Sequence, residues 1–234
     1  MQDSGNSGLY GWHLQLGRVE YKRVLEWQRG LVKLRAEGFA RDTIITVEHP
    51  PVVTVGKDGH VEHFKDLDCK PIAVERGGDV TYHGPGQLVV YFIFNLTRRE
   101  RDLHQFMANI QSGIIETLAK YGISARRDDE HTGIWVKDKK IASVGIAVKK
   151  WISFHGAALN LNTCLSDFTA IQPCGLDAAT MTSAKEILGR EVDLHECSAR
   201  LVKSYCDIFR TTFSPVDLES LAEDVESQSG GYEI

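Results

Sequence analysis

The chain has 234 residues, of which 42% are hydrophobic and 25% are charged, the balance of an ordinary globular protein. The net charge of −5 comes largely from the acidic segment 215–234, and the near-neutral remainder has no long basic stripe, so we expect no nucleic-acid partner. No apolar run approaches the roughly 18 residues that a membrane helix needs, so we expect no membrane association.

The cysteines indicate a reducing compartment, which we take to be the cytoplasm. Their number is odd, and no two of them form a CxxC pair, so the sequence predicts neither a disulfide framework nor a metal site. A single cysteine is most often a buried structural residue, and this default fits Cys69, Cys164, Cys197 and Cys206.

The chain divides into three parts by composition. Residues 1–8 match neither a signal peptide nor an Arg-rich transit peptide, and we expect a disordered end or a cloning remnant. Residues 9–214 form one folded domain, and residues 215–234 form an acidic C-terminal tail.

The first half of the domain mixes strands with one helix. Apolar residues on one helical face predict a helix over Tyr21–Arg35 that ends at Gly38. Alternating or β-branched residues predict strands at 12–16, 43–47, 52–55, 72–74 and 88–94.

The second half carries two longer helices around a run of short strands. Asp102 is placed to cap a helix that runs to Leu118 and closes at Gly122, and Asp193 with Glu196 caps the last helix. Between these helices we expect antiparallel strands at 123–126, 133–136, 141–148 and 151–161. This order favours an α+β fold, with a mixed or antiparallel sheet packed against helices, over repeated βαβ units.

A glycine-rich loop is the most unusual stretch of backbone. Residues 76–87 hold four glycines, a proline and the polar side chains of Arg76, Thr81, His83 and Gln87. Glycine lets main-chain N–H groups approach a ligand closely, so this loop is suited to line a pocket. On these residues alone, a turn between two strands explains the loop equally well.

Three further residues are candidates for chemistry. Cys174 lies between Pro173 and Gly175, a stiff turn that would present a thiol. Lys140 opens a predicted strand. His155 lies inside another strand, where a core histidine bonded to backbone is favoured over a catalytic one. The sequence has no GxxxxGK[ST] phosphate loop, no HExxH and no GxSxG.

Four segments together resemble the lipoyl(octanoyl) transferase family. They are RGGDVTYHGPGQ at 76–87, KIASVGI at 140–146, FHGAALN at 154–160 and QPCG at 172–175, and the resemblance runs from about Leu14 to Phe213. It implies the catalytic-domain fold of biotin and lipoate protein ligases. It also implies that the domain transfers an octanoyl or lipoyl group from acyl carrier protein to a lysine of lipoyl domains, the first step of protein lipoylation, without a cofactor.

The resemblance also implies roles for individual residues. The acceptors would be the lipoyl domains of 2-oxoacid dehydrogenase E2 subunits and the glycine cleavage H protein. Cys174 corresponds to the nucleophile that forms an acyl thioester, and Lys140 to the residue that activates it. Ala157 departs from the larger apolar residue common at its position, so the preferred acyl length does not follow. The segments matching the acyl pocket comprise Arg76, Gly77, Gly78, Asp79, Val80, Thr81, Tyr82, His83, Ser143, Val144, Gly145, Gly156, Ala157 and Ala158.

Two mechanisms for Lys140 and two other functions stay open. A fixed ammonium beside the thiol would favour the thiolate, whereas burial of the lysine would make the amine itself the base. An ATP-dependent lipoate- or biotin-protein ligase of the same fold would leave Cys174 without a role. A non-catalytic module that binds acyl chains or carrier domains would leave both Cys174 and Lys140 without one.

Overall fold

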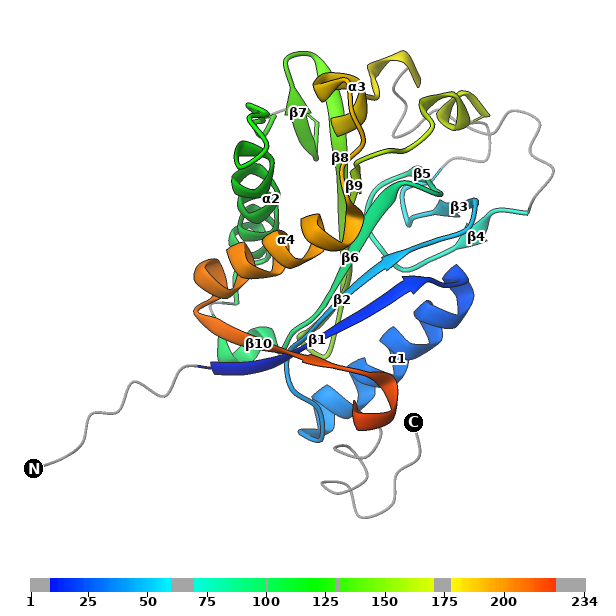
Figure 1. Cartoon of the computed structure of the whole chain (residues 1–234). Helices are drawn as coiled ribbons and strands as arrows, with labels where there is room; N and C mark the ends of the chain where they lie inside the picture. The colour runs from blue at the N-terminus through cyan, green and yellow to red at the C-terminus, as the bar shows by residue number, and fades with distance from the viewer. Residues whose placement is uncertain (1–8, 60–69, 100, 129–130, 171–177, 222–234) are drawn as a thin grey trace, which may run out of the picture.

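The computed structural model describes residues 9–59, 70–99, 101–128, 131–170 and 178–221. A seven-stranded mixed sheet forms the centre of the molecule (Figure 1). Its strands, in spatial order, are β10 (Thr211–Val216), β1 (Leu9–Arg18), β2 (Thr43–Glu48), β6 (Gln87–Ile93), β9 (Ile152–Asn160), β8 (Lys139–Lys149) and β7 (Ile134–Val136). The β10–β1–β2 pairs are parallel and the remaining pairs antiparallel, so the α+β expectation is confirmed.

Helices cover both faces of this sheet because its central strand is apolar on both sides. Along β6, Val90 and Phe92 pack into one core with α2 (Leu103–Ala119) and α4 (Leu194–Phe209). The alternate residues Val89 and Tyr91 pack into a second core with α1 (Tyr21–Glu37). This alternation is the two-residue period of a strand, and it fixes which residues can face a site on the α1 side.

The predicted helix ends are confirmed. The Asp102 side chain accepts hydrogen bonds from two N–H groups of the first turn of α2, and the Asp193 side chain accepts one from Glu196 N. Gly38 ends α1 in the left-handed conformation, with φ of 92°. A fourth helix, α3 (Ala184–Leu188), and three 3₁₀ turns, η2 (Leu96–Arg98), η3 (Leu165–Ala170) and η5 (Ala178–Thr180), complete the helical elements of the described ranges.

A second, three-stranded sheet lies beside the first and carries the glycine-rich loop. It consists of β4 (Ile72–Ala73), β3 (Val52–Val55) and β5 (Val80–His83). β5 runs straight through the loop sequence and pairs antiparallel with β3. The turn at 84–86 then leads into β6, so the glycine-rich stretch connects the two sheets (Figure 1).

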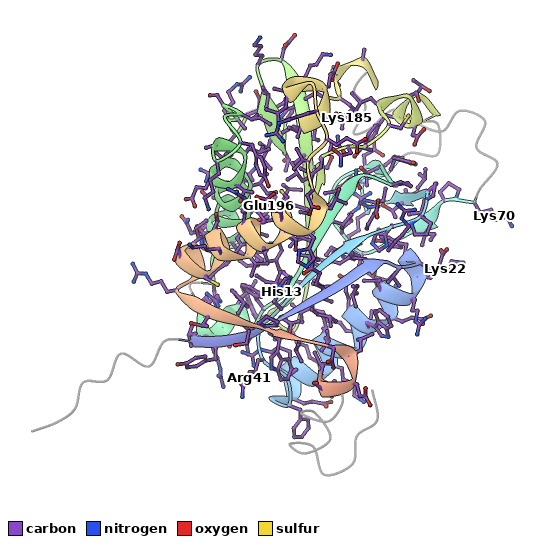
Figure 2. All side chains as sticks on the ribbon, viewed as in Figure 1. His13, Lys22, Arg41, Lys70, Lys185 and Glu196 are labelled. Carbon is purple, nitrogen blue, oxygen red and sulfur yellow. The ribbon has the colours of Figure 1, made fainter. Side chains whose placement is uncertain are left out.

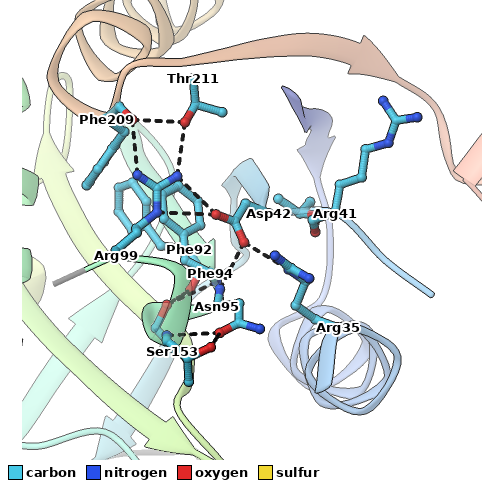
Figure 3. Close-up of polar contacts among 12 residues, drawn as sticks. Arg35, Arg41, Asp42, Phe92, Phe94, Asn95, Arg99, Ser153, Phe209 and Thr211 are labelled. Atoms are coloured by element: carbon cyan, nitrogen blue, oxygen red, sulfur yellow. Dashed lines mark hydrogen bonds and ion pairs between the residues drawn. The ribbon is translucent and has the colours of Figure 1, made fainter. Parts of the chain in front are cut away.

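A buried carboxylate joins four elements near the parallel end of the sheet (Figure 3). Asp42 Oδ1 accepts a hydrogen bond from Arg35 Nε at 2.9 Å and another from Asn95 N at 2.9 Å. Its Oδ2 accepts from Arg99 Nη2 at 3.0 Å, and Arg99 also donates to Thr211 Oγ1. Asp42 therefore ties α1, the start of β2, the turn after β6 and β10 together.

Three expectations need correction. Segment 123–126 forms no strand; its only pairing in the described chain is an isolated bridge between Arg126 and Trp135. Cys164 is exposed rather than buried, and Cys206 is partly exposed, whereas Cys197 is fully buried; Cys69 lies outside the described residues.

The expected C-terminal boundary, between residues 214 and 215, falls inside the edge strand β10. Residues 215 and 216 belong to β10, and Pro215 fits there because β10 is an edge strand, where one side of the backbone needs no ladder partner. Leu221 is buried in the core with α1. Residues 1–8 and 222–234 are not described. Within the described residues, no helix has the length and apolar character to cross a membrane.

Candidate acyl-transfer site

A cavity of about 180 Å³ lies where the two sheets meet. Most of the surface that lines it is apolar. The walls are built by the start of α1, the glycine-rich loop, β5, β6, α2, β8 and β9. Twelve residues predicted for the site contribute to it: Arg76, Gly77, Gly78, Thr81, His83, Lys140, Ser143, Val144, Gly145, Gly156, Ala157 and Ala158.

The glycine-rich loop is held against the cavity from two sides. Gly77 N donates to Ile146 O on β8 at 3.0 Å, which closes the loop over that strand. Gly78 N donates to the Asp58 carboxylate at 2.8 Å, and its φ of +80° suits glycine. The Arg76 guanidinium donates from Nη2 to Thr54 O and Oγ1 at 3.0 Å, so the arginine also braces β3.

The remaining three predicted residues of the loop do not line this cavity. Along β5, Thr81 and His83 face it, while the alternate residues Val80 and Tyr82 pack into a small core with Phe168. The side chains of a strand point alternately to its two faces, so a match over a whole motif does not tell which residues face the cavity. Asp79 accepts a backbone hydrogen bond from Gly56 N at the end of β3 and is absent from the lining.

Lys140 reaches the cavity from the interior. Its side chain is among the largest fully buried ones, and its residue is only 2% exposed. The side chain fits because Gly133, just before β7, has no Cβ, which would lie 2.5 Å from Lys140 Cε. Lys140 O also accepts a hydrogen bond from Thr182 N at 3.0 Å, and Lys140 pairs with Met181.

The floor of the cavity consists of small residues on β8 and β9. Gly145 pairs with Gly156 across these strands, and Ser143 pairs with Ala158. A Cβ at Gly156 would lie 2.1 Å from Val90 O, so a larger residue there would push β9 away from β6. These small side chains leave space above the sheet. Bulky residues on the same strands would fill that space.

His155 is buried, at 1% exposure, as expected of a core histidine, but the hydrogen bond described for it uses its backbone N–H and not its ring. Its φ is +60°, which is rare for a side chain in a strand and marks local strain. His155 lines the cavity, and among the described residues neither ring nitrogen has a hydrogen-bond partner. The Glu75 carboxylate lies 3.5 Å from Nε2 and is held in turn by Arg29. The backbone N–H of His155 donates to Gln28 Oε1, so this hydrogen bond anchors the peptide and not the ring.

The histidines around the cavity are neutral at physiological pH. Burial lowers the pKa of His83 to about 3, with a further lowering by His49. Burial likewise lowers the pKa of His49 and of His155 to about 4. Burial raises the pKa of Tyr21 to about 12, so this phenol also stays uncharged.

Sequence reasoning missed several lining residues because they lie outside the four motifs. Tyr21 comes from the first turn of α1, Met107 from α2 and Tyr91 from β6, all on apolar stripes that predicted core positions. Thr132 precedes β7. A pattern of buried faces cannot distinguish a residue that fills the core from one that borders a cavity.

The predicted nucleophile, Cys174, lies outside the described residues, as does the rest of residues 171–177. Lys140 and the apolar cavity lie within them.

The mixed sheet with helices on both faces is the fold of lipoate and biotin protein ligases. A lipoate-protein ligase A structure bound with ATP superimposes with a TM-score of 0.72 at 17% identity, covering 94% of each chain. A biotin protein ligase from Aquifex aeolicus gives 0.53 at 15% identity, covering 86% of this chain and 70% of that one. At these identities the likeness shows the fold.

The chain belongs to the lipoyl protein ligase A/B catalytic domain family, whose sequence model matches residues 20–206. It is 42% identical over 179 residues to an octanoyltransferase of Geobacter metallireducens, covering 76% of this chain and 84% of that one. It is 41% identical over 218 residues to an octanoyltransferase of Caldanaerobacter subterraneus, covering 89% and 94%.

Proposed function

We propose that the chain is an octanoyltransferase of protein lipoylation that works through an acyl thioester on Cys174. The observation that carries this proposal is a buried lysine, Lys140, beside an apolar cavity that is built from the family's motifs. Relatives named octanoyltransferase, about 40% identical over most of the chain, support the same activity.

The first step moves the acyl group onto the enzyme. The Cys174 thiolate attacks the carbonyl of octanoyl-acyl carrier protein, a new C–S bond forms, and the donor C–S bond breaks. One thioester replaces another, so this step is nearly balanced in free energy. Lys140 takes up the proton of the Cys174 thiol and gives it to the departing donor thiolate, a role that a buried amine can perform.

The second step moves the acyl group onto the acceptor. The amine of a lipoyl-domain lysine attacks the Cys174 thioester, a C–N bond forms, and the C–S bond breaks. The amine proton returns to Lys140. Because an amide replaces a thioester, the step is downhill and needs no ATP. We infer that the acceptors are the lipoyl domains of 2-oxoacid dehydrogenases and the glycine cleavage H protein. A solved structure of similar fold comes from a study of a lipoate protein ligase and its E2 lipoyl domain from Thermoplasma acidophilum.

We further place the enzyme in the cytoplasm, because its three described cysteines are free thiols, as expected in a reducing compartment.

Intact-mass spectrometry tests the proposal. Wild-type protein mixed with octanoyl-acyl carrier protein should gain one octanoyl group, and Cys174→Ser should gain none. Cys164→Ser is the matched control, since Cys164 is exposed and bonded to Ser166, and it should acylate as the wild type does. An adduct that persists in Cys174→Ser would show that another residue is the nucleophile. Acyl transfer that requires ATP would instead identify a ligase.

A further inference from the structure

A buried chain of side-chain amides connects the cavity to the backbone beside Lys140. His83 Nδ1 lies 2.8 Å from Gln87 Oε1. Gln87 Nε2 donates to Tyr82 O at 3.3 Å and to Asn160 Oδ1 at 3.0 Å. Asn160 Nδ2 donates to Thr182 O at 3.0 Å. The three interior members, His83, Gln87 and Asn160, are all at most 5% exposed.

Two backbone carbonyls fix the orientation of every group in this chain. A carbonyl oxygen only accepts, so Thr182 O requires the Asn160 amide nitrogen to face it, which turns Asn160 Oδ1 toward Gln87. Tyr82 O and Asn160 Oδ1 then both require donors from Gln87 Nε2. Gln87 Oε1 is left facing His83, and His83 must donate from Nδ1.

A neutral imidazole that carries its proton on Nδ1 presents a lone pair at Nε2. The cavity keeps His83 neutral, because burial and the neighbouring His49 lower its pKa to about 3, although the hydrogen bond with Gln87 acts in the opposite direction. The ring is also held in place by stacking on Tyr21, with ring centroids 5.6 Å apart. Within the described chain, His83 makes no second side-chain hydrogen bond, and its ring lines the cavity.

We propose that His83 Nε2 is a fixed hydrogen-bond acceptor for the incoming lysine amine, and that Gln87 and Asn160 are positioning residues that hold it in this state. This inference rests on the proposed function and concerns its second step. An attacking amine needs its lone pair directed at the thioester carbonyl, and an acceptor for one of its N–H groups directs it. His83 takes no proton: the C–N bond forms, the C–S bond breaks, and the proton leaves to Lys140.

The two half-reactions separate this role from a structural one. Gln87→Glu places a carboxylate against Nδ1, which raises the pKa of His83 and protonates Nε2, so the acceptor becomes a donor. Transfer from the octanoyl-enzyme to a lipoyl domain should fall by about tenfold at neutral pH and recover as the pH rises. Acylation by octanoyl-acyl carrier protein should stay near the wild-type rate. Gln105→Glu adds the same charge on the exposed face of α2 and should change neither step.

A second pair of variants tests the acceptor directly. In His83→Gln the side-chain oxygen reaches about as far as Nε2, whereas in His83→Asn the amide reaches only the position of Nδ1. Transfer should be retained better in His83→Gln than in His83→Asn, with thermal unfolding measured for both to establish that they fold. Equal loss in the two variants, or a loss confined to acylation, would overturn the proposal. Failure of the wild type to acylate would instead overturn the proposed function.

Discussion

Lys140 combines full burial with a position on a cavity wall, which is rare for a residue type that is usually solvated. Arginine would keep the positive charge but cannot release a proton near neutral pH. We therefore expect Lys140→Arg to lower octanoyl transfer by about a hundredfold or more, the range that a lost general acid–base provides. Single-turnover transfer to a lipoyl domain measures this.

The neighbouring lysine is the matched control for that change. Lys139 precedes it on β8, and its side chain is 44% exposed and paired with Glu186. Lys139→Arg should transfer at the wild-type rate. If Lys140→Arg also transferred normally while folded, Lys140 would have no role in proton transfer.

Under the proposed function, Ala157 would limit the space available for an acyl chain. It lines the cavity, is 4% exposed and pairs with Val90 and Val144 on the neighbouring strands. Ala157→Leu adds three carbon atoms at a position where the surrounding strands cannot move apart. We expect the longest acyl chain accepted to shorten by about two to three carbons. Acylation by a series of acyl-carrier thioesters, read by intact mass, tests this; an unchanged length profile would contradict it.

At the scale of elements, the sequence predicts those whose signal is local. Capping residues and apolar stripes located α1, α2 and α4, and β-branched runs located β2, β3 and β6. β5 was hidden among glycines, because its strand character comes from pairing with β3. β10 was hidden by Pro215, because its place at the sheet edge is a tertiary property.

The candidate site likewise has a part that local sequence patterns predict and a part that depends on tertiary contacts. The motifs predicted which segments meet, since fourteen of their residues line one cavity. They did not predict that Val80 and Tyr82 turn away, which depends on strand register, nor that Tyr21 and Met107 join from distant helices. A contact between elements that are far apart in the chain cannot be predicted from a local sequence pattern.

The buried carboxylate of Asp42 should stabilise the junction between elements. Asp42→Asn would leave Arg35 and Arg99 without their shared counter-charge in an environment where all three side chains are at most 14% exposed. Removing one partner of a buried ion pair costs about 3–5 kcal/mol. We expect a loss of this size in the free energy of unfolding from urea denaturation. Glu191→Gln, which removes an exposed pair with Lys185, should leave the urea midpoint unchanged.

At the scale of the whole molecule, four buried histidines make stability depend on pH. The pKa values of His13, His49 and His155 are lowered to about 4, and that of His83 to about 3. In the unfolded chain each returns to about 6.5, so the unfolded state binds more protons below that pH. Their stabilising contribution is complete above pH 6.5 and is lost as the pH falls toward 4.

His13 isolates this effect because it lies outside the candidate site. It lies on β1 (Figure 2). Its Nε2 is 2.9 Å from Thr46 Oγ1, and Ser198 Oγ on α4 donates to the same oxygen. His13→Gln keeps a polar group near Thr46 but cannot titrate. The wild type should therefore lose about 2 kcal/mol more free energy of unfolding than His13→Gln between pH 7 and pH 5. Urea denaturation at both pH values measures the difference; equal losses in the two proteins would show that His13 does not hold its neutral form in the fold.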